Sequence, residues 1–414
     1  LYKYIYADVK MYISPSQHGF MEKRSAVTNL ACFSQFTSEA VDNKQQVDTI
    51  YLDFRKAFDQ IDHYVLLQKL SNFGFSGSLL KLLESYLLNR VQCVQYRGYK
   101  SKNIVPSSGV PQGSNLGPLL FLLFVNDITE VVSAGNLLFA DDFKIYRVIK
   151  SLDDCVALQN DLDNVDQWCL LNRLFLNTIK CLLVTYTRKL YPICFQYSIN
   201  NETLRRENSV LELGIMFDSA LTFVPHIGNT ISKAYKILGF IYRNSKEFNK
   251  TQTLKTLFIA LVRSRLEYGS IIWHTTYQVH VSNIESIQRM FLKYLAYRED
   301  HVYPVRGYPQ LQLLSTFNFS SLNTGRLILG VRFILNLLNY KVDCAWLLGR
   351  INFLTPKFNV RQHKLFYCPP CKSNLLQKSP IVAMCTVYNK ISKDCDLSAK
   401  NASIAACITA EYGA

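Results

Sequence analysis

Two adjacent aspartates, Asp141 and Asp142, stand between two short apolar stretches at residues 137–139 and 143–146. This pattern indicates a tight β-hairpin with both carboxylates at its tip. Neighbouring carboxylates repel each other, and a divalent cation bound between them relieves the repulsion. A third acid, Asp53, ends the apolar stretch 48–54, which predicts a buried strand with an acid at its carboxyl end. Together the three acids predict a two-metal site of the kind that serves in-line phosphoryl transfer.

An alternative interpretation of the aspartate pair is an ordinary turn. Aspartate is common in turns because its short side chain accepts hydrogen bonds from its own backbone. The pair alone does not separate the two interpretations, so the surrounding sequence has to decide.

The composition indicates a globular chain with a large core. Its 414 residues are 49% apolar, enough for two or three domains. The apolar run 119–125 is far shorter than the ~20 residues of a membrane span, and residues 1–10 do not resemble a signal peptide. Because the chain does not begin with Met, we interpret it as a fragment. Twelve scattered cysteines favour reduced thiols, and hence a nuclear or cytoplasmic protein that is not bound to a membrane.

The charge is unevenly distributed along the chain. Residues 1–219 hold equal numbers of acidic and basic residues, so the whole net charge of +15 lies in residues 220–414. This split predicts that the first half carries the chemistry and the second half binds a polyanion such as nucleic acid. A solvated basic surface without a partner is the alternative.

The apolar patterns predict a mixed chain, with strands in the first half and helices in the second. We expect strands at 48–54, 91–96, 181–187, 193–199 and 210–217. We expect helices at 63–73 with Asp62 as N-cap, at 79–88, from Pro118 to 132, and at 152–175. Further helices are predicted at 227–246, 251–273, 281–298 and 322–338.

Ordered blocks of residues resemble the reverse transcriptases of non-LTR retrotransposons of the jockey-like or a related arthropod type. The blocks are Gln17 to Phe20, Tyr51 to Asp59, Gly109 to Ser114 with the run up to Phe121, Phe139 to Asp142, and Leu176, Asn177 and Lys180. A looser match continues through residues 213–218, then His226 and Ile227 into the helical part, and further to Arg326, Arg350, Phe353, Pro356 and Arg361. The resemblance therefore covers nearly the whole chain.

The resemblance implies an α+β fold arranged as a polymerase right hand. Residues 1–219 would form fingers and palm with an antiparallel sheet, the fingers being incomplete at the N-terminus. Residues 220–300 would form a helical thumb, and 301–414 a basic, mostly helical C-terminal region. The implied activity is RNA-directed DNA synthesis, with an RNA template, a DNA primer and dNTPs as partners. The family's endonuclease region is expected to be absent from this fragment.

The resemblance also assigns roles to the acids. Asp53 and Asp141 would bridge the metal ions and Asp142 would support them, while the backbone carbonyl of Phe54 would complete one coordination shell. The expected cofactor is Mg²⁺, with Mn²⁺ as a substitute.

Three further residues match positions that contact the nucleotide in the family. The ring of Phe58 would exclude a ribose 2′ hydroxyl, although a Phe at this spacing also fits a core position. The Gln112 amide would contact the incoming nucleotide or the template, or else belong to a plain helix-entry turn. Lys180 would lie near the triphosphate and protonate pyrophosphate, or else be a solvated lysine at a strand edge.

The fingers block departs from the family pattern. Met21 stands where an arginine usually follows Gly-Phe, and Met cannot hold a phosphate. Lys23 and Arg24 are close in sequence and are predicted to neutralise phosphates instead. The departure leaves a second interpretation open, in which the chain is an inactive nucleic-acid-binding remnant.

A further motif near the C-terminus has the spacing of a metal knuckle. Cys368 and Cys371 form the pair, with His363, Cys385 and Cys395 near them in sequence. A structural zinc site needs two well-spaced ligand pairs, and the second pair here is poor. We therefore expect reduced thiols and no zinc.

A DNA-templated polymerase or a splicing maturase would use the same palm, and the carboxylates do not reveal the template.

Overall fold

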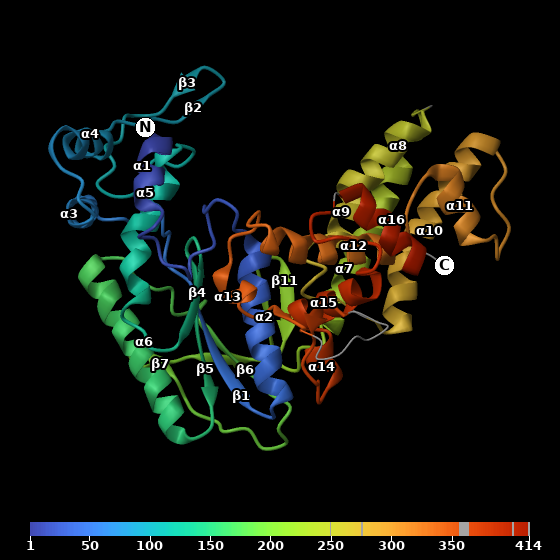
Figure 1. The fold of residues 1–414 in the computed structure, drawn as a ribbon. Coiled ribbons are helices and arrows are strands. Elements are labelled where there is room, and N and C mark those ends of the chain that lie inside the picture. The colour runs from blue at the N-terminus through green and yellow to red at the C-terminus, as the bar shows by residue number, and fades with distance from the viewer. Residues whose placement is uncertain (249, 275, 356–363, 400, 413–414) are drawn as a thin grey trace. The chain divides into compact units, whose positions relative to one another are not determined.

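The computed structural model describes residues 1–248, 250–274, 276–355, 364–399 and 401–412. The chain forms two compact units (Figure 1). The first comprises Leu1–Asn29 and Lys44–Asn208, and the second comprises Leu30–Asn43 and Ser209–Ala414. The segment 30–43, which the sequence places among the fingers, thus belongs to the second unit. The assignment of fingers-palm, thumb and C-terminal region stays a prediction, and Pro356, Arg361 and His363 lie outside the described residues.

A five-stranded sheet forms the centre of the first unit. Its strand order is β4-β5-β1-β6-β9, and the strands are β1 (Gln46–Leu52), β4 (Gly135–Phe139), β5 (Asp142–Ile149), β6 (Leu182–Tyr186) and β9 (Arg205–Glu207). The pairs β4/β5, β5/β1 and β1/β6 are antiparallel, and only the edge pair β6/β9 is parallel. The mixed helix and sheet fold therefore agrees with the predicted α+β class, apart from this one parallel pair.

The helices of this unit are α1 (Tyr2–Val9), α3 (His63–Asn72), α4 (Gly77–Leu87), α5 (Leu116–Val125) and α6 (Leu152–Asn172). Helix α6 packs against β5 of the sheet, α1 and α3 pack against α5, and α4 packs against α3. Residues 119–125 of α5 are all buried, as expected of a helix that is apolar on every side. Figure 1 shows α6 beside β5, and the apolar residues of α6 lie in the same core cluster as Ile50 and Ile145 of the sheet. Short hairpins complete the unit, β2 (Gln95–Tyr96) with β3 (Tyr99–Lys100) and β7 (Ser198–Ile199) with β8 (Glu202–Thr203).

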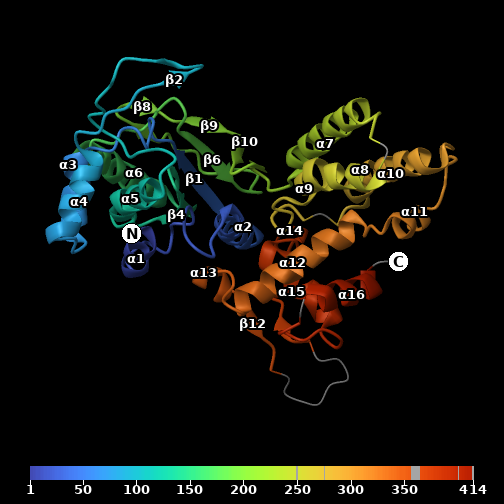
Figure 2. The ribbon, with the colours of Figure 1, turned by 90° about the horizontal axis from the view of Figure 1, so that it is seen from above.

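The second unit is mostly helical. Its principal helices are α2 (Ala26–Asp42, which begins in the first unit), α7 (Val224–Asn244), α8 (Thr251–Phe258), α10 (Gln278–Asp300), α11 (Gln310–Phe317), α12 (Leu322–Leu338), α15 (Pro380–Ile391) and α16 (Asn401–Tyr412). Figure 2 shows α12, α15 and α16 packed together. The shorter elements are α9 (Ser264–Glu267), α13 (Ala345–Leu348), α14 (Asn374–Gln377), and the strands β10 (Ser209–Glu212), β11 (Ile215–Asp218), β12 (Asn352–Phe353) and β13 (Phe366–Tyr367).

Several predicted elements are confirmed in type and place. The carboxylate of Asp62 accepts hydrogen bonds from the backbone N–H groups of Tyr64 and Val65, so it caps α3 as predicted. Helix α12 has the predicted bounds, and β1 ends one residue before Asp53. The helix after Pro118 begins at Leu116 and ends at Val125, where a short 3₁₀ turn (Asn126–Thr129) replaces the predicted continuation to 132.

Other predictions were wrong for identifiable reasons. Residues 210–217 form the hairpin β10–β11 instead of one strand, because Leu213 and Gly214 turn the chain with positive φ values of 44° and 85°. Most of 193–199 is not a strand, because the side-chain amide of Gln46 bonds both N and O of Ile193. The helix predicted at 251–273 contains a π turn at Ile259–Arg263 and ends at Glu267. The strand predicted at 91–96 is reduced to the short β2.

No helix within the described residues combines the length and the apolarity that crossing a bilayer requires. All twelve cysteines lie within the described residues, and the sulfurs of Cys32 and Cys344 lie 3.2 Å apart.

Candidate active site

The hairpin β4–β5 carries the aspartate pair at its tip. Phe139 pairs with Asp142, so Ala140 and Asp141 form a two-residue turn. Ala140 has φ 58°, a left-handed conformation that costs a residue with a Cβ about 1–2 kcal/mol. Asp141 is half-buried and Asp142 is exposed. Because the turn is strained, it depends on support from its surroundings.

The register between β1 and β5 places Asp53 at this turn. Leu52 pairs with Phe143, and one further step along the same antiparallel register puts Asp53 beside Asp142. Residues opposite each other in such a pair have Cβ atoms about 4.5–5.5 Å apart. The backbone of Asp53 is fixed from the other side, since Asn177 N donates to its carbonyl at 2.7 Å. The structure thus brings Asp53, Asp141 and Asp142 to the same edge of the sheet.

Electrostatic contacts link Asp53, Asp141 and Lys180. The ammonium of Lys180 lies 3.2 Å from Oδ2 of Asp53, and this inaccessible oxygen has no hydrogen bond. Burial raises the pKa of Asp141, and the charge of Asp53 raises it further. A backbone hydrogen bond at Asp141 and the charge of Lys180 act in the opposite direction. Two carboxylates therefore share a region of negative potential that a single lysine only partly compensates.

The donor set fits an open site for a hard cation. Among the described residues, no group of three or more His, Cys, Asp or Glu is arranged as a complete set of metal ligands. Mg²⁺ does not require such a set, because it is usually held by one or two carboxylates together with water and substrate phosphates. Oδ2 of Asp53, which forms no hydrogen bond, and the carboxylate of Asp141, whose pKa is raised by burial and by Asp53, are oxygen donors of the kind that a hard cation prefers.

Gln17 supports the turn, a role that the sequence did not reveal. Its side chain is buried, and Oε1 accepts hydrogen bonds from Gly19 N at 2.8 Å and Ala140 N at 3.0 Å. The backbone of the same segment pairs with β4, since His18 N donates to Leu138 O at 2.9 Å. A Cβ on Gly19 would collide with the backbone of Ala140, so only glycine fits there. The block was recognised by family resemblance, but spacing gave no sign that it touches the aspartate turn.

A buried lysine lies beneath the same hairpin. Lys144, on β5, is 2% exposed, and its ammonium donates to Oδ1 of Asn29 at 2.9 Å. The Asn29 amide in turn donates to Leu138 O on β4. In the sequence, Lys144 stands inside the otherwise apolar stretch 143–146, but we predicted no role for it.

Phe58 lies near the site on a packed platform. Its ring stacks on Phe121 of α5 with centroids 4.3 Å apart and meets Phe20 edge-on at 6.1 Å. The side chain remains partly accessible. The ring packs on the core, as one interpretation of the sequence predicted, and its contact with a nucleotide stays a prediction. Phe54, the other aromatic of the block, is buried and bridges to Leu176 directly after Asp53.

Gln112 lies in a loop that is held against the segment after β1. Its amide Nε2 donates to Oδ1 of Asp59 at 2.8 Å, and the side chain is exposed. Gly109 has φ 86°, and a Cβ there would lie 2.7 Å from the backbone oxygen of Asp59. The buried His63 fixes the same turn, with Nε2 2.7 Å from Gly109 O. The loop therefore has one position relative to Asp59.

The basic residues of the fingers block differ in environment. Arg24 donates through Nη1 to the carbonyls of Ser14, Pro15 and Gln17, so its guanidinium stabilises the loop that carries Gln17. Lys23 is exposed, with φ 61°. Met21 is buried in the core of the unit. Contact between phosphate and Lys23 or Arg24 stays a prediction.

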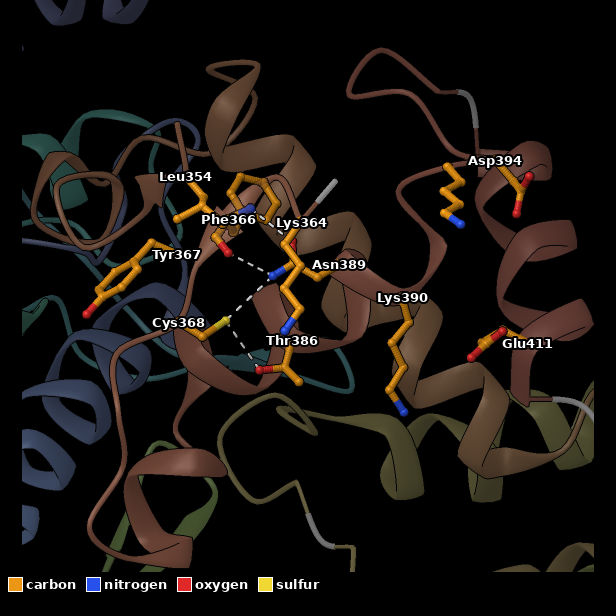
Figure 3. Close-up of a pocket in the computed structure, with 11 residues that line it drawn as sticks. Leu354, Lys364, Phe366, Tyr367, Cys368, Thr386, Asn389, Lys390, Asp394 and Glu411 are labelled. Atoms are coloured by element: carbon orange, nitrogen blue, oxygen red, sulfur yellow. Dashed lines mark hydrogen bonds between the residues drawn. The ribbon is translucent and has the colours of Figure 1, made fainter. Parts of the chain in front are cut away.

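The cysteine pair lies in the second unit, where Cys368 lines a cavity of about 780 Å³ (Figure 3). Cys368 Sγ is 3.4 Å from Oγ1 of Thr386 and 3.8 Å from Nδ2 of Asn389. Burial raises the pKa of the Cys371 thiol, which favours its protonated form. The candidate ligand His363 lies outside the described residues.

Comparison with known proteins agrees with the geometry. Residues 1–242 match the family model described as "Reverse transcriptase (RNA-dependent DNA polymerase)". The chain is 33% identical over 238 residues to the "RNA-directed DNA polymerase from mobile element jockey" of Drosophila melanogaster, covering 55% of this chain and 26% of that protein. It is 26% identical over 303 residues to the "Probable RNA-directed DNA polymerase from transposon BS" of the same species, covering 70% of this chain and 33% of that protein.

The structural similarity to solved proteins is weaker. A telomerase from Candida albicans shares 12% identity over 78% of this chain and 51% of that chain, with a TM-score of 0.46. The chain spans about a quarter to a third of the length of the jockey and BS relatives named above. Because the family model matches more than half of the chain, the chain belongs to the reverse transcriptase (RNA-dependent DNA polymerase) family.

Proposed function

We propose that this chain is the polymerase part of a non-LTR retrotransposon protein and copies RNA into DNA. The observation that carries the proposal is the register that brings Asp53 to the Asp141–Asp142 turn, where burial and, to a smaller extent, the charge of Asp53 raise the pKa of Asp141. The family match and the names of the jockey and BS relatives support the same activity.

The three carboxylates would hold one or two Mg²⁺ ions, with Mn²⁺ as a substitute. When bound, the ions supply Lewis-acid chemistry for attack of a primer 3′ hydroxyl on the α-phosphate of a dNTP. Lys180, which pairs with Asp53, would turn toward the triphosphate when a nucleotide binds. Its ammonium would then donate a proton to the departing pyrophosphate.

Phe58 and Gln112 would select and orient the nucleotide. The stack of Phe58 on Phe121 prevents the ring from moving aside, so it would exclude a ribose 2′ hydroxyl. The Gln112 amide would exchange its bond to Asp59 for one to the nucleotide or the template. The template would be RNA and the primer DNA. We assign residues 1–219 to fingers and palm, 220–300 to the thumb and 301–414 to a basic C-terminal region, in a protein of the nucleus or cytoplasm.

Primer extension tests the proposal. The 414-residue chain, with Mg²⁺, poly(rA) and oligo(dT), should incorporate dTTP. The variant Asp141→Asn should lose roughly a thousandfold in rate, because a metal ligand contributes several kcal/mol to the transition state. Asp153→Asn is the matched control, since Asp153 is an exposed acid at the start of α6. Replacing poly(rA) with poly(dA) measures the preference for RNA.

Two outcomes would contradict the proposal. Equal incorporation by the wild type and Asp141→Asn would show that these carboxylates do not serve the reaction. Duplex binding that weakens with salt, without incorporation in either metal, would favour the interpretation as an inactive nucleic-acid-binding remnant.

A further inference from the structure

Two buried cysteines from distant parts of the chain meet in the second unit. Cys32 lies in α2, and Cys344 directly precedes α13 (Figure 1). Their sulfurs lie 3.2 Å apart, although the residues are 312 positions apart in the sequence. The two residues are only 3% and 8% exposed. The contact is therefore made by the fold and not by neighbourhood along the chain.

The position of the first thiol is fixed by further contacts along one face of α2. The side chains of this helix that contact C-terminal segments of the unit follow one another at spacings of three and four residues, and they are Cys32, Gln35, Glu39 and Asp42. Oε1 of Gln35 accepts a hydrogen bond from Ile381 N at 3.0 Å. The carboxylate of Glu39 lies 3.4 Å from Nε of Arg350, which follows Cys344 by six residues. The same helix face thus holds both the thiol and the segment that carries its partner.

Only a short movement separates this contact from a disulfide. The sulfurs of a disulfide lie about 2.05 Å apart, so bond formation needs an approach of about 1 Å. A cysteine sulfur moves by rotation about a single side-chain bond, so most of this approach requires no change in the backbone. Packing of the two thiols as small apolar groups is the alternative, because free cysteine is commonly buried. The two interpretations differ in what an oxidant does to the pair.

We propose that Cys32 and Cys344 form a redox modification site, which hydrogen peroxide converts into a disulfide. The more exposed Cys344 reacts first. Its thiolate attacks one oxygen of the peroxide, the O–O bond breaks, and the sulfur becomes a sulfenic acid while the departing hydroxide takes up the thiol proton as water. The sulfur of Cys32 then attacks the sulfenic sulfur, and the S–O bond breaks as hydroxide leaves with the second thiol proton. Two thiols thereby lose two electrons, and one peroxide is reduced to two waters.

The cross-link has consequences for stability. It joins residues 312 positions apart, so it restrains the unfolded chain and should stabilise the second unit. A thiol reductant should reverse it, and compartments buffered by glutathione would keep the pair reduced at rest. The site is independent of the proposed polymerase activity, because its formation needs neither a nucleotide nor a metal.

Peptide mapping of the full chain tests the site. The chain is treated with hydrogen peroxide, its remaining thiols are blocked with N-ethylmaleimide, and the monomer band of a non-reducing gel is digested with trypsin. Cleavage after lysine and arginine releases Cys32 in peptide 25–44 and Cys344 in peptide 342–350, each of which contains a single cysteine. We expect the two peptides to be joined, with two hydrogen atoms fewer than their sum, and to separate again in dithiothreitol.

Cys385→Ser is the matched control, since Cys385 is a buried cysteine of α15 in the same unit. This variant should keep the cross-link, whereas Cys32→Ser should lose it. Oxidation should raise the melting temperature of the wild type and of Cys385→Ser by about 5–10 °C, and it should leave that of Cys32→Ser unchanged. Cys344→Ser is a second variant that removes the other sulfur, and it should behave as Cys32→Ser does.

Two results would overturn the site. If the linked peptides are absent from the folded wild type while the exposed Cys93 is oxidised in the same sample, the two thiols only pack together. If folded and urea-unfolded chains give equal yields of the linked peptides, the fold does not select this pair. Selection by the fold predicts a yield about tenfold or more higher in the folded chain, because the ends of so long a loop rarely meet in the unfolded chain.

Discussion

Replacing Gln17 tests whether the aspartate turn depends on its support. In Gln17→Ala, the N–H groups of Gly19 and Ala140 lose an acceptor at 2.8 Å and 3.0 Å inside a buried region. Each unsatisfied buried group costs about 1–3 kcal/mol. The two losses share one side chain and are not fully additive, so we expect a decrease of about 2–4 kcal/mol in the free energy of unfolding.

The same change should impair catalysis beyond its effect on stability. Ala140 precedes Asp141 in a strained turn, and without Gln17 the turn can relax. A displacement of about 1 Å at a reacting group can cost about a hundredfold in rate. We therefore expect kcat for primer extension to fall about tenfold to a hundredfold under conditions where the variant remains folded, as confirmed by urea unfolding followed by circular dichroism.

Gln46→Ala is the matched control. Gln46 is also a buried glutamine with hydrogen bonds to a backbone N–H and a backbone carbonyl, but it lies at the end of β1 that is remote from Asp53. It should lose a similar amount of stability and keep its kcat. If both variants have the same kcat, or if Gln17→Ala costs less than about 0.5 kcal/mol, the support we assign to Gln17 does not exist.

Three further predictions concern the same unit. The pKa of Asp141 is raised in the fold, so its ionisation should lower the free energy of unfolding of the metal-free protein as the pH rises from about 4. For the same reason, protons should compete with Mg²⁺ more strongly than at an ordinary aspartate. If the free energy of unfolding of the wild type follows the same pH profile as that of Asp141→Asn, this prediction is wrong. Gly109→Ala should lower the melting temperature more than Gly98→Ala. Both glycines have a positive φ, but only at Gly109 would an added Cβ meet backbone, at 2.7 Å. An equal decrease in melting temperature for the two variants would contradict this steric explanation. Lys180→Met should raise the pKa of Asp141 further and lower the Mg²⁺ concentration required at pH 7, because the ammonium no longer competes with the cation for Asp53, whereas an unchanged requirement would show that the ion pair with Asp53 has no influence on the site.

The sequence predicted those parts of the fold that depend on local patterns. An apolar strand ending in Asp53 and an aspartate pair between apolar stretches both specify backbone geometry through a two-residue period. Asp62 is a good N-cap wherever a helix follows, so α3 could be predicted from its start. These elements already contain the three acids, and the order of the blocks fixed the family.

The contacts that join distant segments could not be predicted in this way. Gln17 is polar and stands in a polar stretch, and nothing local shows that its amide reaches Ala140. Arg326 contributes to a basic half that looked like surface, yet it is buried among the helices of the second unit. The sequence 210–217 reads as one strand until the positive φ values at residues 213 and 214 divide it. Tertiary packing decided each of these cases.

The bond between Gln17 and Ala140 joins residues 123 positions apart. Contacts of such long sequence separation form late in folding, because the loop-closure entropy must be overcome before they contribute. During refolding, helices and the local hairpin should therefore regain their circular dichroism signal before the chain can extend a primer. A shortened protein that begins after Phe20 would retain every carboxylate of the site and still lack a firmly held turn.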